Sequence, residues 1–268
     1  MAEEGEIQES GQAGEAISDR IKVKDTIARA FRMCYGNPST FLGMAAVVAL
    51  PTFVISLLAL ARDPEAKGSM GQGLVGLIFL AMVVAAFVLA FYYAGAIPLL
   101  TAFTLDNRPL GWTDAFGWIH DRRLFWGVFL ATLLLGLAVL GGLILLIIPG
   151  LLFLVWFTLA VSARVLGEFP GRKALSESRR LMQPVVFRGG AGLLAILIGV
   201  PLVIGGGANG ISWAVWGFGS RAVPQVLMTS IVNFALGVFW GPVAYVALAI
   251  VYIELSGGLS SLRKDLFL

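Results

Sequence analysis

The chain has 268 residues, of which 58% are apolar and only 13% are charged. A soluble globular domain usually carries about a quarter charged residues, so this composition excludes a protein whose whole surface faces water. It predicts lipid as the solvent for much of the molecule. The formal net charge of +3 does not indicate nucleic acid, because the basic residues lie beside apolar segments, where they orient a membrane protein.

Residues 1–20 are acidic and contain no long apolar run. A secretory signal begins with basic residues and continues with a hydrophobic core, so this segment is predicted to be a disordered acidic tail. A polytopic membrane domain is expected at 21–256, followed by a short cytoplasmic tail at 257–268.

Six apolar segments predict an all-α membrane protein with six transmembrane helices, at 41–61, 74–97, 124–148, 151–166, 189–204 and 227–253. A helix needs about 20 residues to cross the roughly 30 Å hydrocarbon core. The uncharged stretch 124–163 is about twice that length, so it must fold back on itself. Pro149 and Gly150 are the expected break of this hairpin. The glycine-rich run 205–210 is likewise expected to end the fifth helix.

The basic residues predict which side of the membrane each connection occupies. With six spans, sixteen of the 19 Lys and Arg residues fall on one side, together with both termini, and only Arg62, Lys67 and Arg221 fall on the other. Such asymmetry is the positive-inside pattern. It predicts a multi-pass protein of the plasma (inner) membrane with cytoplasmic N- and C-termini.

Three segments on the basic side, 23–35, 112–119 and 174–182, have apolar residues at helical spacing opposite charged ones. This periodicity predicts three amphipathic helices at the membrane interface. Each leads into an apolar segment, which favours three repeats of surface helix plus hairpin, while ordinary helical loops remain the alternative. Anionic headgroups are the expected partners of their interfacial basic residues, Arg29, Arg32, Arg122, Arg123, Arg179 and Arg180.

Several motifs resemble those of the glycerophosphoryl diester phosphodiesterase membrane-domain family. They are the stretches DTIARAFRMCYGNPSTFL from Asp25 and NRPLGWTDAF from Asn107, the run Ile148-Pro149-Gly150 with Glu168, Gly171, Ala174, Ser178 and Leu181, and the ending Tyr252-Ile253-Glu254-Leu255. The resemblance implies a stand-alone membrane module that lacks the catalytic domain to which such modules are sometimes fused. It therefore implies an architecture and a membrane-associated role, and no activity.

The apolar segments contain few polar groups, and these are the candidate functional residues: Glu254, Arg164, Asn233 and Gln225. A carboxylate at membrane depth is a functional candidate by default. Glu254 lies near the cytoplasmic end, however, so an ion pair with Arg164 or Arg188 is the expected role, with an ion or substrate site as the alternative. One cysteine and one histidine give no basis for a metal cage, and we predict no catalytic residue and no cofactor.

These features predict a non-enzymatic integral membrane module that acts as a scaffold or accessory subunit of an inner-membrane assembly. Its expected partners are membrane lipids, other membrane proteins or further copies of itself, and not nucleic acid. The alternative is a transporter of a small solute or lipid, because the repeats, the prolines in the apolar segments and the intramembrane polar groups are also typical of transporters.

Overall fold

The computed structural model describes residues 22–61, 70–108, 110–121, 124–145, 147–186, 189–216, 223–259 and 262, and this part of the chain contains helices and no strands. The helices are α2 (Val23–Gly36), α3 (Pro38–Ala61), α4 (Met70–Leu105), α5 (Trp112–Asp121), α6 (Leu124–Leu145), α7 (Ile147–Phe157), α8 (Ala160–Leu166), α9 (Gly171–Met182), α10 (Gly190–Trp216), α11 (Val223–Phe239) and α12 (Gly241–Leu255). Nearly all of residues 1–20 and 257–268, predicted to be tails, lie outside the described residues.

The lengths and compositions of these helices are those of a multi-pass membrane protein. Five helical segments are long and apolar enough to cross a bilayer: Pro38–Leu58, Gly76–Leu105, Leu124–Gly141, Gly190–Ile211 and Pro224–Leu255. The predicted segment at 151–166 corresponds to a shorter apolar stretch, Leu152–Leu166. The predicted all-α fold is confirmed.

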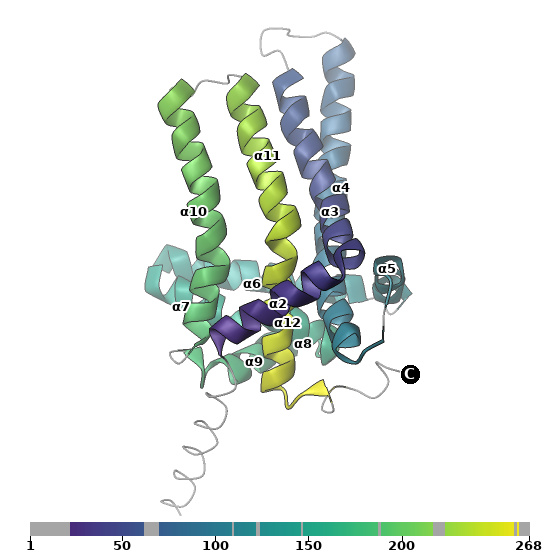
Figure 1. Ribbon diagram of the computed structural model, residues 1–268, viewed down its shortest axis with the longest axis vertical. Helices are drawn as coiled ribbons and strands as arrows, with labels where there is room; N and C mark the ends of the chain where they lie inside the picture. The colour runs from purple at the N-terminus through teal and green to yellow at the C-terminus, as the bar shows by residue number, and fades with distance from the viewer. Residues whose placement is uncertain are drawn as a thin grey trace, which may run out of the picture.

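The order of the elements follows the predicted repeat, since α2, α5 and α9 each precede a pair of apolar helices. Helices α10, α11, α3 and α4 contact one another in that order and form a row in the upper half of Figure 1. The other helices lie in the lower half, where α2 crosses α12. The three predicted surface helices are therefore at the same end of the row.

Packing density changes along the long axis of the molecule, and α4 shows the change within one helix. Its large apolar side chains are exposed from Leu74 to Phe87, and Leu77 is 67% exposed. From Phe91 to Ala102 most of its side chains are buried. Thirty-six residues make a helix of about 54 Å, well beyond the roughly 30 Å of a hydrocarbon core. The second half of α4 is therefore available to build a protein core.

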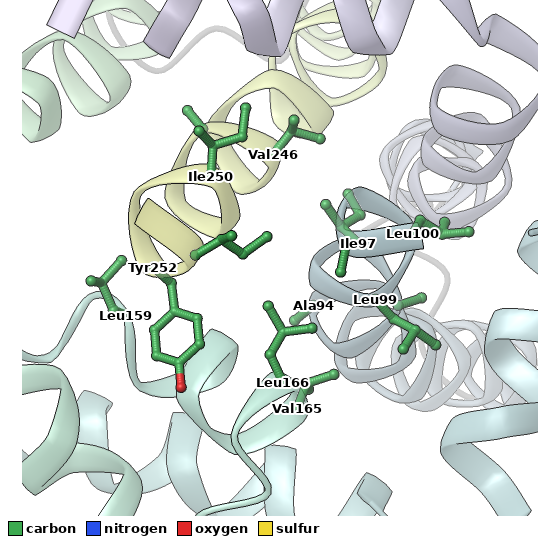
Figure 2. Close-up of a cluster of buried hydrophobic side chains, with 14 of the residues drawn as sticks. Ala94, Ile97, Leu99, Leu100, Leu159, Val165, Leu166, Val246, Ile250 and Tyr252 are labelled. Atoms are coloured by element: carbon green, nitrogen blue, oxygen red, sulfur yellow. The ribbon is translucent and has the colours of Figure 1, made fainter. Parts of the chain in front are cut away.

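That core lies between α4, α8 and α12 (Figure 2). Ile97 and Leu100 of α4, Leu166 of α8 and Ile250 of α12 are all less than 3% exposed. Tyr252 of α12 is also buried, and its hydroxyl lies so close to Gly167 that a Cβ there would be 2.6 Å from it. A glycine at the end of α8 is thus what lets the two helices approach.

The predicted hairpin is present, because α6 and α7 pack against each other. Helix α6 is described to Leu145 and α7 from Ile147, and residue 146 between them lies outside the described residues. Pro149 and Gly150, the predicted break, lie in the first turn of α7 as described. A proline in this position removes no helical hydrogen bond, since the first N–H groups of a helix have no intrahelical acceptor.

The predicted end of the fifth helix at 205–210 is wrong, because α10 continues through these residues to Trp216. The amide of Asn209 donates a hydrogen bond to the carbonyl of Gly205, at 2.8 Å, inside the helix. Glycine weakens a helix in water, whereas in lipid an unwound segment would leave its N–H and C=O groups unsatisfied. The apolar surroundings therefore favour a continuous helix despite its glycines.

Candidate functional site

The carboxylate of Glu254 is paired with Arg29, and not with Arg164, one of the two partners that the sequence led us to expect. Nη1 of Arg29 in α2 lies 2.6 Å from Oε1 of Glu254 at the end of α12. The Arg29 side chain is 54% exposed and that of Glu254 is 21% exposed. The pair therefore joins a surface helix near one end of the chain to the last apolar helix. Arg188 lies outside the described residues.

Arg164 contacts the segment between α8 and α9. Its Nη1 donates hydrogen bonds to the backbone carbonyls of Glu168 and Phe169, at 3.2 and 3.4 Å. Its guanidinium lies directly against Gly127 of α6, where any Cβ would collide with it. Nε of Arg164 is buried and has no hydrogen-bond partner among the described residues. Arg164 thus holds the α8–α9 connection beside α6.

The two other candidates, Asn233 and Gln225, lie on α11, 21 and 29 residues before Glu254, which is roughly 32 and 44 Å along a helix. Asn233 is exposed, and its Oδ1 lies 3.7 Å from the Cβ position of Gly205 in α10. Gln225 occupies the first turns of α11. The structure therefore does not bring Asn233 and Gln225 together with Glu254 and Arg164 in one site.

The basic residues of the surface helices are exposed where the structure describes them. Arg29 and Arg32 lie on α2, and Arg179 and Arg180 lie on α9. The guanidinium of Arg179 lies 4.7 Å from the ring centroid of Trp156, a cation–π contact. Glu177 accepts hydrogen bonds from Arg180, which raises the pKa of that guanidinium further and keeps it charged. Arg122 and Arg123 lie outside the described residues.

Sequence reasoning missed the role of Ser178, which is fully buried on the inner side of α9. Its hydroxyl donates to the carbonyl of Trp156 at 2.8 Å and accepts from the N–H of Leu159 at 3.1 Å. These two groups flank the interruption between α7 and α8. Ser178 therefore satisfies both sides of a helix break, and a serine within an otherwise apolar stripe was the available signal.

A polar pocket of about 250 Å³ was also not predicted. It lies where α2 passes into α3 and where α4 passes toward α5, and it is partly open to the outside. We call it the α3–α4 pocket. Its lining residues are Asn37, Thr40, Thr104, Asn107, Arg108 and Leu110.

Backbone hydrogen bonds fix the chain around this pocket. The carbonyl of Asn37 accepts from the N–H groups of Thr40 and Phe41 as α3 begins. On the opposite side, the N–H of Arg108 donates to the carbonyl of Phe103 at 2.9 Å. Asn107 has a φ of 57°, in the left-handed region that asparagine tolerates better than most residues. The chain therefore turns tightly after α4 and presents successive polar side chains to the pocket.

Groups suited to metal or thiol chemistry are dispersed. In the described ranges, no three His, Cys, Asp or Glu side chains are close enough to hold a metal ion. Cys34 is buried on α2, and burial raises the pKa of its thiol to about 12. Nδ1 of His120 lies 3.1 Å from the hydroxyl of Tyr92, where either group can be the donor.

Comparisons with protein-family models, with curated proteins and with solved structures gave no match to this chain. The resemblance to the glycerophosphoryl diester phosphodiesterase membrane-domain family stays a prediction.

Proposed function

We propose that this protein is a non-enzymatic integral membrane module, a scaffold or accessory subunit that binds another transmembrane helix within an inner-membrane assembly. The observation that carries the proposal is a set of open glycines on the exposed side of α10, the last helix of the row, beside the exposed side chains of Leu202 and Val203. Gly192, Gly199 and Gly206 recur every seven residues and therefore share one side of the helix. A Cβ at any of the three would meet nothing within 4 Å.

Small residues at such spacing allow two membrane helices to approach closely, so that their backbones contribute to van der Waals packing. Ala195 and Gly210 extend the same exposed side. Where a helix faces only lipid, large side chains are equally stable there, as the exposed Leu77 and Leu80 of α4 illustrate. A run of glycines on an outer face is thus better suited to a protein partner than to acyl chains.

The polar side chains of the spans also favour a packing role over transport. The hydroxyls of Thr229 and Ser230 donate to carbonyls within α11, and that of Thr101 donates to a carbonyl within α4. Hydroxyls satisfied by their own helix are not directed at a passing solute. These contacts stabilise individual helices in an apolar medium.

The proposed orientation places the lower end of Figure 1 in the cytoplasm. The surface helices α2, α5 and α9 lie there, with their basic residues. The helix ends that flank Arg62, Lys67 and Arg221 in the sequence lie at the upper end. This arrangement supports cytoplasmic termini and contact of the surface helices with anionic lipid.

The proposal is tested by affinity purification in mild detergent after crosslinking in the membrane, comparing wild type with Gly199→Leu and Gly206→Leu. Gly136→Leu on α6 is the matched control, because Gly136 also has open space around it. We expect a crosslinked partner, either another membrane protein or a second copy, with wild type and Gly136→Leu. Its yield should fall about tenfold in the α10 variants, as expected from the loss of roughly 1.4 kcal/mol of packing. An unchanged yield in the α10 variants would contradict the proposal.

A further inference from the structure

The α3–α4 pocket is independent of the open glycines of α10 and is not explained by a packing role. Cavities that remain between packed helices are ordinarily small and closed. The α3–α4 pocket is partly open and has a volume of about 250 Å³. Pockets for small organic ligands usually measure about 300–1,000 Å³. The α3–α4 pocket therefore suits a compact polar group.

The lining of the pocket favours an anion. The two carboxamides and the hydroxyl of Thr40 can donate hydrogen bonds, whereas the hydroxyl of Thr104 donates to the carbonyl of Leu100 at 2.7 Å. Among the described residues that line the pocket, Arg108 is the charged one. A planar guanidinium matches the geometry of phosphate or carboxylate oxygens. Asp106, which does not line the pocket, lies with Oδ2 3.1 Å from Nε of Arg108. This carboxylate orients the guanidinium and also weakens its attraction for an anion.

The position of the pocket points to phosphate as that anion. Thr40 lies in the first turn of α3 and Thr104 in the last turn of α4. The segment Pro38–Leu58 is just long enough to cross the hydrocarbon core, so Thr40 lies where this span leaves it, and Thr104 reaches the same pocket from the end of the longer helix α4. The zone where a span leaves the hydrocarbon is the zone of lipid phosphates. The first turn of α3 adds the partial positive charge of a helix N-terminus.

We propose that the α3–α4 pocket binds a phosphate group, with Arg108 as its charged ligand and Asn107 as a neutral donor. The group is carried either by an anionic phospholipid or by a small soluble phosphate. Both sources present tetrahedral oxygens to the same side chains.

The test is titration calorimetry on the full chain in a neutral detergent with three probes. These are a short-chain phosphatidylglycerol, inorganic phosphate, and short-chain phosphatidylcholine as the zwitterionic comparison. Arg108→Gln should weaken binding at least about tenfold, as expected from losing charge-assisted hydrogen bonds. Asp106→Asn should tighten binding a few-fold, because it removes a competing carboxylate. A merely destabilised fold would not produce opposite effects from two residues that pair with each other.

Arg172→Gln is the matched control, because Arg172 is exposed on α9 and is not among the residues that line the pocket. It should bind the probe as wild type does. Asn107→Gly is a second variant that removes a donor while suiting the left-handed φ of this residue, and it should also weaken binding. Phosphatidylglycerol binding without inorganic phosphate binding identifies a lipid headgroup, and the reverse identifies a soluble phosphate. No binding by either, or equal losses in Arg108→Gln and Arg172→Gln, would overturn the proposal.

Discussion

Trp240 lies between α11 and α12, and its indole N–H donates to the carbonyl of Leu197 in α10 at 3.0 Å. In a regular helix that carbonyl would accept from the residue four positions later, which here is Pro201 and has no N–H. The indole therefore satisfies an acceptor that a proline leaves open. In an apolar medium such a group costs several kcal/mol if unpaired, so one residue both completes α10 and attaches it to the next span.

Cys34 gives a prediction at the scale of a single residue. Its side chain is 1% exposed, and burial raises the pKa of the thiol to about 12. At pH 7.5 nearly all of it is therefore in the unreactive thiol form. We expect maleimide to label Cys34 at least roughly a hundredfold more slowly in mild detergent than in denaturing detergent.

The matched control for this labelling is Tyr35→Cys in a Cys34→Ser background, because Tyr35 is the neighbouring residue and is 45% exposed. It should react rapidly under both conditions. Rapid labelling of Cys34 in the native protein would show that α2 does not lie against α12 as described.

At the scale of elements, the surface helix α9 has a structural role in the apolar part of the chain. Ser178 bonds to groups on both sides of the interruption between α7 and α8, and Arg179 covers Trp156 on the outer side. Helix α9, which follows α7 and α8 in the sequence, therefore fixes the ends of these two short helices next to each other.

Ser178→Ala should lower the free energy of unfolding by about 1–3 kcal/mol, because a buried N–H and a buried carbonyl lose their partner. Unfolding in a denaturing detergent series measures this. Ser176→Ala, on the exposed side of the same helix, should change stability by less than about 0.5 kcal/mol. Equal effects of the two substitutions would contradict the assigned role of Ser178.

The elements themselves were largely predictable, because length, charge-free runs and apolar periodicity are local properties. The surface helices and the hairpin follow from such patterns. The end of the fifth helix was mispredicted, since Gly205 to Gly207 break helices in water but not in an apolar medium where backbone groups have no other partner.

The contacts between distant elements were not predictable. Arg29 and Glu254 are 225 residues apart. Several arginines were predicted to lie on the same side of the membrane as Glu254, and the sequence does not show which of them pairs with it. Arg164 was predicted to pair with Glu254 because it lies near the end of a span. Its guanidinium instead donates hydrogen bonds to the backbone carbonyls of Glu168 and Phe169. The α3–α4 pocket combines residues from two connections that no periodicity relates.

At the scale of the whole molecule, one end is a row of four apolar helices and the other is a compact core bordered by three surface helices (Figure 1). The exposed apolar side chains of the row match lipid or a helical partner, whereas the core end carries most of the charge. This difference between the two ends is the basis of the proposed orientation, and the α3–α4 pocket lies at the end that carries the surface helices.

The most direct test of this account is cysteine-accessibility labelling in a Cys34→Ser background, with a membrane-impermeant maleimide on intact cells and on inverted vesicles. Single cysteines at Ser69 and Ser220 should be labelled from outside, because few basic residues flank them. A cysteine at Ser176, exposed on α9, should be labelled only in inverted vesicles. External labelling at Ser176 would contradict the orientation and, with it, the assignment of the core end and its surface helices to the cytoplasm.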